Sequence, residues 1–95
     1  MSGYRIHRQV TEFGEHVRGW RMVLGLTAKQ VSERAGITRD TLRKIESGNP
    51  NVSFNSVTQV LRALGILDQL VDAADPLASD IGRLRAGRLT RKRAR

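Results

Sequence analysis

The stretch Ala35–Gly48, "AGITRDTLRKIESG", decides how the rest of the sequence is interpreted. Gly36 ends one segment of helical period, and Thr38 is a hydroxyl residue of the kind that begins the next helix. The first two exposed positions expected in that helix are Arg39 and Asp40. Only the aspartate suits this place, because the positive end of the helix dipole repels a cation. A local conflict of this kind is typical of a functional site.

Gly, Pro and polar residues divide most of the sequence into segments of helical period, which predicts an all-α fold of five helices. Residues suited to capping stand at most expected starts, and a glycine or a proline follows the expected ends. Thr27 and Gln30 have the spacing of a capping box. The side chains expected to face the core are Phe13, Val17, Trp20 and Leu24 in a helix that begins at Thr11, Val31 and Ala35 after Thr27, Leu42 and Ile45 after Thr38, Val57, Val60, Leu61 and Leu64 after Ser53, and a fifth apolar stripe over 66–74.

Composition divides the chain into three parts. Residues 1–10 form an N-terminal arm, and two interpretations of its alternating pattern stay open: a flexible arm, or a strand that forms in a dimer. Residues 11–76 form the compact body and residues 77–95 a basic tail, expected as a marginal helix followed by a disordered segment. Residues 1–76 carry ten Lys and Arg against eight Asp and Glu, whereas the tail carries seven Lys and Arg and one Asp. The body is therefore nearly neutral, so any binding of DNA by the body depends on where its charges lie.

Several classes of function are disfavoured by what the sequence lacks. The absence of cysteine excludes disulfides and thiolate metal sites. No apolar run approaches the roughly 20 residues that span a bilayer, and the N-terminus lacks the apolar stretch of a signal peptide, so we expect a cytoplasmic protein. His7 and His16 are the only histidines, they lack metal-ligating spacing, and no Gly-rich phosphate loop occurs. We therefore expect no enzyme activity, no cofactor and no metal site.

Two short helices joined by a tight turn at Gly36 have the helix-turn-helix pattern, in which the second helix enters the major groove of DNA. Arg39 can contact both acceptors of a guanine, and Asp40 can accept from a cytosine amino group or orient the arginine. The alternative is that both are ordinary solvated charges at a helix start, but the five-helix context favours base recognition. RNA is the weaker candidate, because the aromatic side chains that could stack bases are spread apart.

Residues 25–65 resemble the XRE-type helix-turn-helix domain of Cro and phage repressors. The shared motifs are the Gly-Leu-Thr start, the Ala-Gly-Ile-Thr turn, the Ile-Glu-x-Gly ending and the final Leu-Gly. With the first and fifth helices, the resemblance covers roughly residues 12–74. It implies a lambda-repressor-like fold and a repressor that binds double-stranded DNA in a sequence-specific manner.

The same resemblance implies roles for individual residues. Thr38 is expected to cap the helix or touch a phosphate, and Thr41 to contact the DNA backbone or a thymine methyl group. Arg21 is expected to pair with Glu46. The first position of the second helix is Ala28, where the family usually has a phosphate-binding Gln, and Lys29 is the candidate substitute. The expected DNA-binding residues are Lys29, Gln30, Thr38, Arg39, Asp40, Thr41, Arg43 and Lys44.

A narrower resemblance concerns the body followed by residues 75–88, "DPLASDIGRLRAGR". This combination is similar to HipB-like antitoxins of toxin-antitoxin pairs. It implies a bacterial protein, found at the nucleoid when bound to DNA, that represses its own operon and sequesters a HipA-like serine/threonine kinase. Two alternatives stay open: a protein-interaction subunit that mainly holds the kinase, and a stand-alone phage- or plasmid-type repressor.

A homodimer is expected, because one recognition helix reads only a few base pairs and a palindromic operator offers two half-sites. The expected dimer surface is the fifth helix around Leu67, Leu70 and Val71. The basic tail has three interpretations: an inert solvated segment, a set of phosphate contacts with strong salt dependence, or a segment that orders on a partner protein. The residues concerned are Arg91, Lys92, Arg93 and Arg95.

Overall fold

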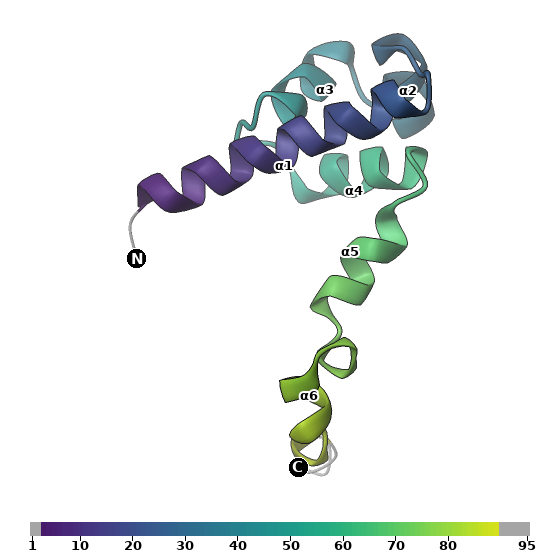
Figure 1. Cartoon of the computed structure of the whole chain (residues 1–95). Coiled ribbons are helices and arrows are strands. Elements are labelled where there is room, and N and C mark those ends of the chain that lie inside the picture. Colours follow the sequence, from purple (N-terminus) through teal and green to yellow (C-terminus); the bar gives the residue numbers. More distant parts are fainter. Residues whose placement is uncertain (1–2, 90–95) are drawn as a thin grey trace.

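The computed structural model describes residues 3–89, which contain helices and no strands. Figure 1 shows a helical body, from which the N-terminal end of the first helix and the C-terminal helices project in different directions. The elements are α1 (Gly3–Val23), α2 (Ala28–Ala35), α3 (Arg39–Glu46), α4 (Phe54–Ala63), α5 (Leu67–Ala74), the short 3-10 helix η1 (Pro76–Ala78) and α6 (Asp80–Leu84). The all-α prediction and the five main helices are confirmed.

The core of the body is formed by α1–α4. Val31 and Val60 are fully shielded from solvent, and Leu42 and Val17 nearly so. Helix α1 packs against α3, and α2 packs against α4. The buried hydrophobic side chains are Val17, Val31, Ala35, Leu42, Ile45, Val60, Leu61 and Leu64. Because none follows Leu64 within residues 3–89, the described segment beyond α4 depends on half-buried contacts.

The local signals that begin α2, α3 and α4 act as the sequence predicts. Thr27 Oγ1 accepts from the Gln30 backbone N–H at 3.1 Å, and Gln30 Oε1 accepts from the Thr27 N–H at 2.8 Å, which completes the capping box. Ser53 caps α4 in the same manner through the Ser56 N–H. These bonds satisfy donors that a helix start leaves free.

The expectation of an arm or a strand before residue 11 was wrong for residues 3–10, which are the start of α1. Thr11 lies inside this helix, and its hydroxyl donates to the His7 carbonyl at 3.1 Å. Ile6, Val10 and Phe13 have helical spacing as well as partial alternation. Extending an existing helix adds one hydrogen bond per residue without a new nucleation cost, so the helical pattern prevails.

The face of α1 that packs on the body also differs from the prediction. Phe13, Trp20 and Leu24 were expected in the core, but all three are exposed, Trp20 to 42%. The inward face contains Gly14 and Val17, which are the buried residues of this helix. The helix is therefore rotated so that its smallest side chain lies against α3. The sequence analysis missed this because a hydrophobic stripe does not mark a glycine as a contact.

The C-terminal region agrees in part with the prediction. Leu67 and Leu70 of α5 are half-buried and pack against the core, whereas Val71 is 60% exposed. The marginal helix expected after Pro76 is present as α6. Arg91, Lys92, Arg93 and Arg95, expected in a disordered segment, lie outside the described residues. Within residues 3–89, no helix combines the length and apolarity needed to cross a bilayer.

Replacing Gly14 by alanine should lower the free energy of unfolding by about 1–3 kcal/mol, the cost of overpacking a tight contact. A Cβ at this position would lie 2.5 Å from the Ile45 carbonyl oxygen and 2.7 Å from that of Glu46. Gly19 is the matched control in the same helix, because a Cβ there meets nothing within 4 Å. Gly19→Ala should raise the free energy of unfolding by about 0.5–1 kcal/mol. Urea unfolding followed by circular dichroism measures both, and equal effects would contradict the packing described here.

Candidate nucleic-acid interface

The turn between α2 and α3 fixes the direction in which α3 leaves the body. Gly36 has a φ of 70°, in the left-handed region that favours glycine, and its N–H donates back to Glu33 and Ser32 carbonyls. The Ile37 N–H also donates to the Ser32 carbonyl, at 3.0 Å, and the Ile37 side chain packs against the core. A half-buried residue inside the turn thus holds the two helices at one angle.

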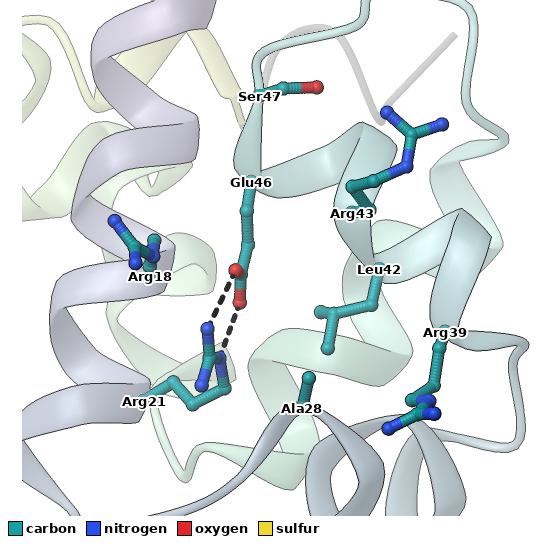
Figure 2. Close-up of a pocket in the computed structure, with 8 residues that line it drawn as sticks. All are labelled: Arg18, Arg21, Ala28, Arg39, Leu42, Arg43, Glu46 and Ser47. Carbon is teal, nitrogen blue, oxygen red and sulfur yellow. Dashed lines mark hydrogen bonds and ion pairs between the residues drawn. The ribbon is translucent and has the colours of Figure 1, made fainter.

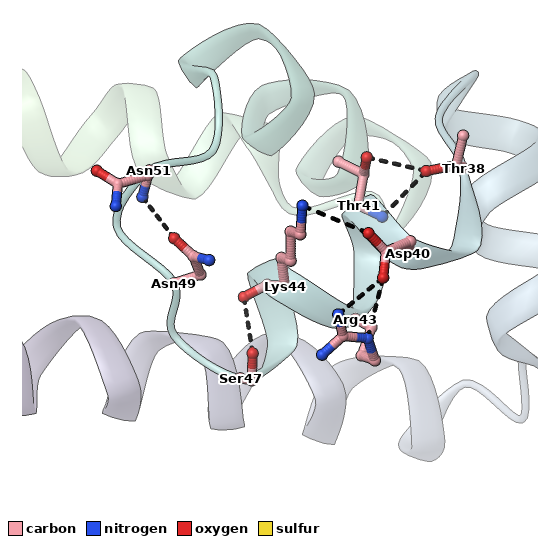
Figure 3. A network of polar contacts seen from close by, with 8 residues as sticks. All are labelled: Thr38, Asp40, Thr41, Arg43, Lys44, Ser47, Asn49 and Asn51. Carbon is pink, nitrogen blue, oxygen red and sulfur yellow. Dashed lines mark hydrogen bonds and ion pairs between the residues drawn. The ribbon is translucent and has the colours of Figure 1, made fainter.

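The first turn of α3 is closed by two threonines. Thr38 Oγ1 accepts from the Thr41 backbone N–H at 3.1 Å, and the two hydroxyl groups lie 2.9 Å apart (Figure 3). The cap expected for Thr38 is therefore confirmed. Thr41 is half-buried beside it, so its hydroxyl is held at the start of the helix.

The two faces of α3 differ sharply. Leu42 and Ile45 are buried in the core. Arg39, Asp40 and Arg43 are exposed on the other side, and Lys44 is half-buried. This short helix therefore presents a charged outer surface on a rigid apolar base.

Arg21 and Glu46 form a two-pronged ion pair between α1 and the end of α3 (Figure 2). Arg21 Nε lies 2.8 Å from Glu46 Oε2, and Nη2 donates to Oε1 at 3.0 Å. The remaining Arg21 nitrogen, Nη1, donates to the Leu26 carbonyl at 3.2 Å. The two side chains are only 15% and 10% exposed, and the hydrogen bond that Arg21 donates to Glu46 raises the pKa of Arg21 above its ordinary value. The pairing expected from the resemblance is thereby confirmed.

Asp40 organises cations on the outer face of α3 (Figure 3). Its Oδ1 accepts from Arg43 Nη2 at 2.7 Å and from Nε at 3.2 Å, while Lys44 Nζ lies 3.4 Å from Oδ2. The Arg43 hydrogen bond is the main reason that the pKa of Asp40 is lowered. Any stability from this network is present above the ordinary carboxyl pKa and is lost as the pH falls through the lowered value, and solvent screens it. The arginine that Asp40 orients is Arg43 and not its neighbour Arg39.

A groove runs between α1 and α3, with a volume of about 420 Å³. Its floor contains Leu42 and Ala28, and the Arg21–Glu46 pair lies along one side (Figure 2). Because several of its residues are arginines, we call it the arginine groove. Its lining residues are Arg18, Arg21, Ala28, Arg39, Leu42, Arg43, Glu46 and Ser47.

Two of these arginines supply uncompensated charge. Neither Arg18 nor Arg39 has a salt-bridge partner among residues 3–89. The sequence analysis missed Arg18, although its position one turn before Arg21 places both on the same side of α1. It also missed Ser47, which ends α3 beside the groove. Guanidinium groups around an open groove are suited to bind phosphate oxygens.

The two candidate residues on α2 lie near the start of that helix. Lys29 is exposed, and its side chain reaches solvent. Gln30 is exposed as well, but its side-chain oxygen is engaged in the capping box. Across the described part of the chain, no three His, Cys, Asp or Glu side chains gather closely enough to hold a metal ion.

Comparison with known proteins adds three findings. A family described as "Helix-turn-helix domain" matches residues 12–74. A protein of Methanothermobacter thermautotrophicus, named as an uncharacterized HTH-type transcriptional regulator, is 39% identical over 49 residues, which are 52% of this chain and 71% of that protein. No solved structure matches the chain.

Removing the partner of Arg21 should destabilise the fold strongly. Glu46→Ala leaves a mostly buried guanidinium uncompensated, and we expect the free energy of unfolding to fall by about 3 kcal/mol. Arg21→Met combined with Glu46→Leu should recover most of this loss, because two apolar side chains leave no buried charge. Asp40→Asn is the control for an exposed ion pair and should change thermal stability little. If the free energy of unfolding of the double variant stays as low as that of Glu46→Ala, the uncompensated charge is not the cause of the lost stability.

Proposed function

This chain belongs to the family of helix-turn-helix domains, and we propose that it is a transcription regulator whose helix α3 recognises bases in the major groove of duplex DNA. The observation that carries this proposal is the polarity of α3. Leu42 and Ile45 anchor the helix from behind, while Arg39, Asp40 and Arg43 are exposed on its outer face. A major groove admits one α-helix, and side chains of its first turns reach the base edges.

In this proposal Arg39 is the principal base-reading residue. It stands at the first position of α3 and has no salt-bridge partner among the described residues, so no bond must be broken before it contacts a guanine. Arg43 is held by Asp40 and is oriented before binding. Thr38, Thr41, Lys44, Lys29 and Gln30 are proposed to contact the backbone or adjacent base edges.

The arginine groove is proposed to seat a backbone phosphate. Arg18 lines this groove from α1 and is the proposed phosphate contact, while Arg39, on the α3 side, is left to the bases. Such a contact positions the protein on the duplex and carries no sequence information. The DNA-binding surface would then extend from α3 onto α1.

We further propose a homodimeric repressor that acts on a palindromic operator in the cytoplasm. A single α3 reads only a few base pairs, and two-fold symmetry doubles the contacts. The exposed side chain of Val71 and the half-buried Leu67 and Leu70 on α5 are the proposed centre of the dimer surface.

A narrower proposal is that the protein is a HipB-like antitoxin that represses its own operon and binds a HipA-like kinase. It depends on the similarity of residues 75–88 and not on the helix-turn-helix match, which ends at residue 74. Co-purification with a kinase from a neighbouring reading frame supports it. A chain that occupies its operator fully without such a partner favours the stand-alone repressor.

Arg39→Ala should reduce affinity for a duplex from the gene's own promoter by about 1–3 kcal/mol, the value of one good base contact. Binding to a scrambled duplex should stay nearly unchanged, because phosphate contacts remain. Fluorescence anisotropy titrations at two salt concentrations measure both. Equal wild-type affinity for the two duplexes, insensitive to Arg39, would overturn the proposed function.

Arg18→Gln should change DNA affinity in a different way from Arg39→Ala. If Arg18 contacts a phosphate, its loss weakens binding to promoter and scrambled duplexes by the same factor and reduces the salt slope of log K by about 0.9. Arg8→Gln is the matched control, since it removes the same charge from an exposed position of α1 away from the groove. Slopes that are identical for the two variants would contradict the proposed role of the groove.

A further inference from the structure

The segment from Ile66 to Leu89, here called the α5–α6 arm, projects from the body (Figure 1). No residue in it is fully buried. Ile81 and Leu84 are 61% and 83% exposed, and Val71, Leu77 and Leu89 are exposed as well. The radius of gyration of the chain is 16.3 Å, against about 12 Å for a compact domain of this length. The arm therefore carries an apolar surface that the body does not cover.

This arm is nevertheless tightly built. Asp75 accepts from the Leu77 N–H at 2.9 Å and Ser79 Oγ accepts from the Gly82 N–H at 3.1 Å, which begins η1 and α6 respectively. Arg83 donates to the Leu77 carbonyl at 2.9 Å. A Cβ at Gly82 would lie 1.6 Å from the Pro76 carbonyl oxygen, so only glycine fits. The sequence thus specifies the shape of a segment that lacks a core of its own.

The charges of the arm are separated along the chain. Its acidic residues come first, and between Ala63 and Gly82 there is no Lys or Arg. Asp80 and Arg83 pair with each other, and Asp75 is used as a cap. Apart from the capping residue Asp75, the arm's charges without a salt-bridge partner among residues 3–89 are Asp68 and Asp72 near its beginning and Arg85 and Arg88 near its end.

We infer that two copies of this chain pair through their arms in antiparallel orientation about a two-fold axis. The acidic beginning of one arm then faces the basic end of the other, and symmetry repeats this attraction. The exposed side chains of Val71, Leu77, Ile81 and Leu84 lie between the arms and lose contact with water. A two-fold interface must be complementary to itself. The charges of the arm meet this condition, because its acidic beginning and its basic end attract each other when two arms lie antiparallel. A parallel pairing is disfavoured because it brings like charges together.

The inference rests on the proposed dimer and says which surfaces form it. It extends the interface expected on α5 to η1 and α6. Because the surplus charges lie at the two ends of the arm, they select the orientation of the pair, while the apolar stripe supplies most of the driving force.

A charge-swap experiment on the full chain tests the inference by sedimentation velocity. Variant A carries Asp68→Arg and Asp72→Arg, and variant B carries Arg85→Asp and Arg88→Asp. Each variant alone places like charges at both ends of the antiparallel pair, so its dimer dissociation constant should rise about tenfold or more. An equimolar mixture of A and B should form a heterodimer with nearly wild-type affinity, because opposite charges meet again at both ends.

Glu12→Arg with Glu15→Arg is the matched control for variant A, since it makes the same change in net charge at exposed positions of α1. This control should dimerise like the wild type. Misfolded variants cannot restore each other, so recovery in the mixture separates lost pairing from lost folding. A monomeric wild type, variants that stay dimeric alone, or a mixture that stays monomeric would each overturn the antiparallel pairing.

Promoter titrations of the same preparations separate this inference from the proposed function. If the wild type distinguishes promoter from scrambled DNA but the charge-swap variants do not behave as expected, the regulator proposal stands and the arm pairing is overturned. If the mixture of variants A and B restores the dimer but the wild type binds both duplexes equally, the arm pairing stands and the regulator proposal is overturned.

Discussion

The crossing of α1 and the end of α3 is the contact on which the rest of the structure depends. Two glycines allow it. Gly14 lies against the carbonyl groups of Ile45 and Glu46, and a Cβ at Gly48 would lie 2.5 Å from the Thr11 Cα. Backbone therefore meets backbone from both sides. The Arg21–Glu46 pair then fastens the same two helices further along α1, where the side chains span a wider gap.

This crossing also explains how a helix of eight residues, too short to be stable alone, is held in a fixed position on the body. Its start is fixed by the Thr38 cap and by Ile37 in the turn. Its end is fixed by Glu46 and by the backbone contact with α1. Only the outer side chains are left to adapt, which agrees with a binding surface built on a fixed scaffold.

Much of this could be predicted from local sequence because the signals are local. The caps of α2, α3 and α4 and the Thr27–Gln30 box depend on neighbouring residues alone and were placed correctly, whereas the start expected at Thr11 was wrong. The Arg21–Glu46 pair was expected from the resemblance. The extension of α1 to Gly3 was missed because alternation over a few residues fits two structures, and only the continuing helix decides between them.

Other features depend on contacts between distant segments and have no local signal. The rotation of α1 that exposes Trp20 follows from the space at Gly14, which a hydrophobic pattern does not reveal. The arginine groove joins residues from α1, α2 and α3, so Arg18 could not be assigned before the helices were placed. The exposed apolar side of the α5–α6 arm likewise becomes evident only once the body is seen to leave it uncovered.

In the part of the chain that the structure describes, no residue after Leu64 is fully buried, and this has an evolutionary consequence. Substitutions at the exposed positions of the α5–α6 arm need no compensating change in the core around α3, and substitutions on the outer face of α3 need none in the arm. The two surfaces can therefore diverge independently after gene duplication. Under the proposed base recognition by α3 and the proposed pairing of the arms, paralogues that descend from such a chain can acquire a new target sequence while keeping their assembly, or stop mixing with one another while keeping their target.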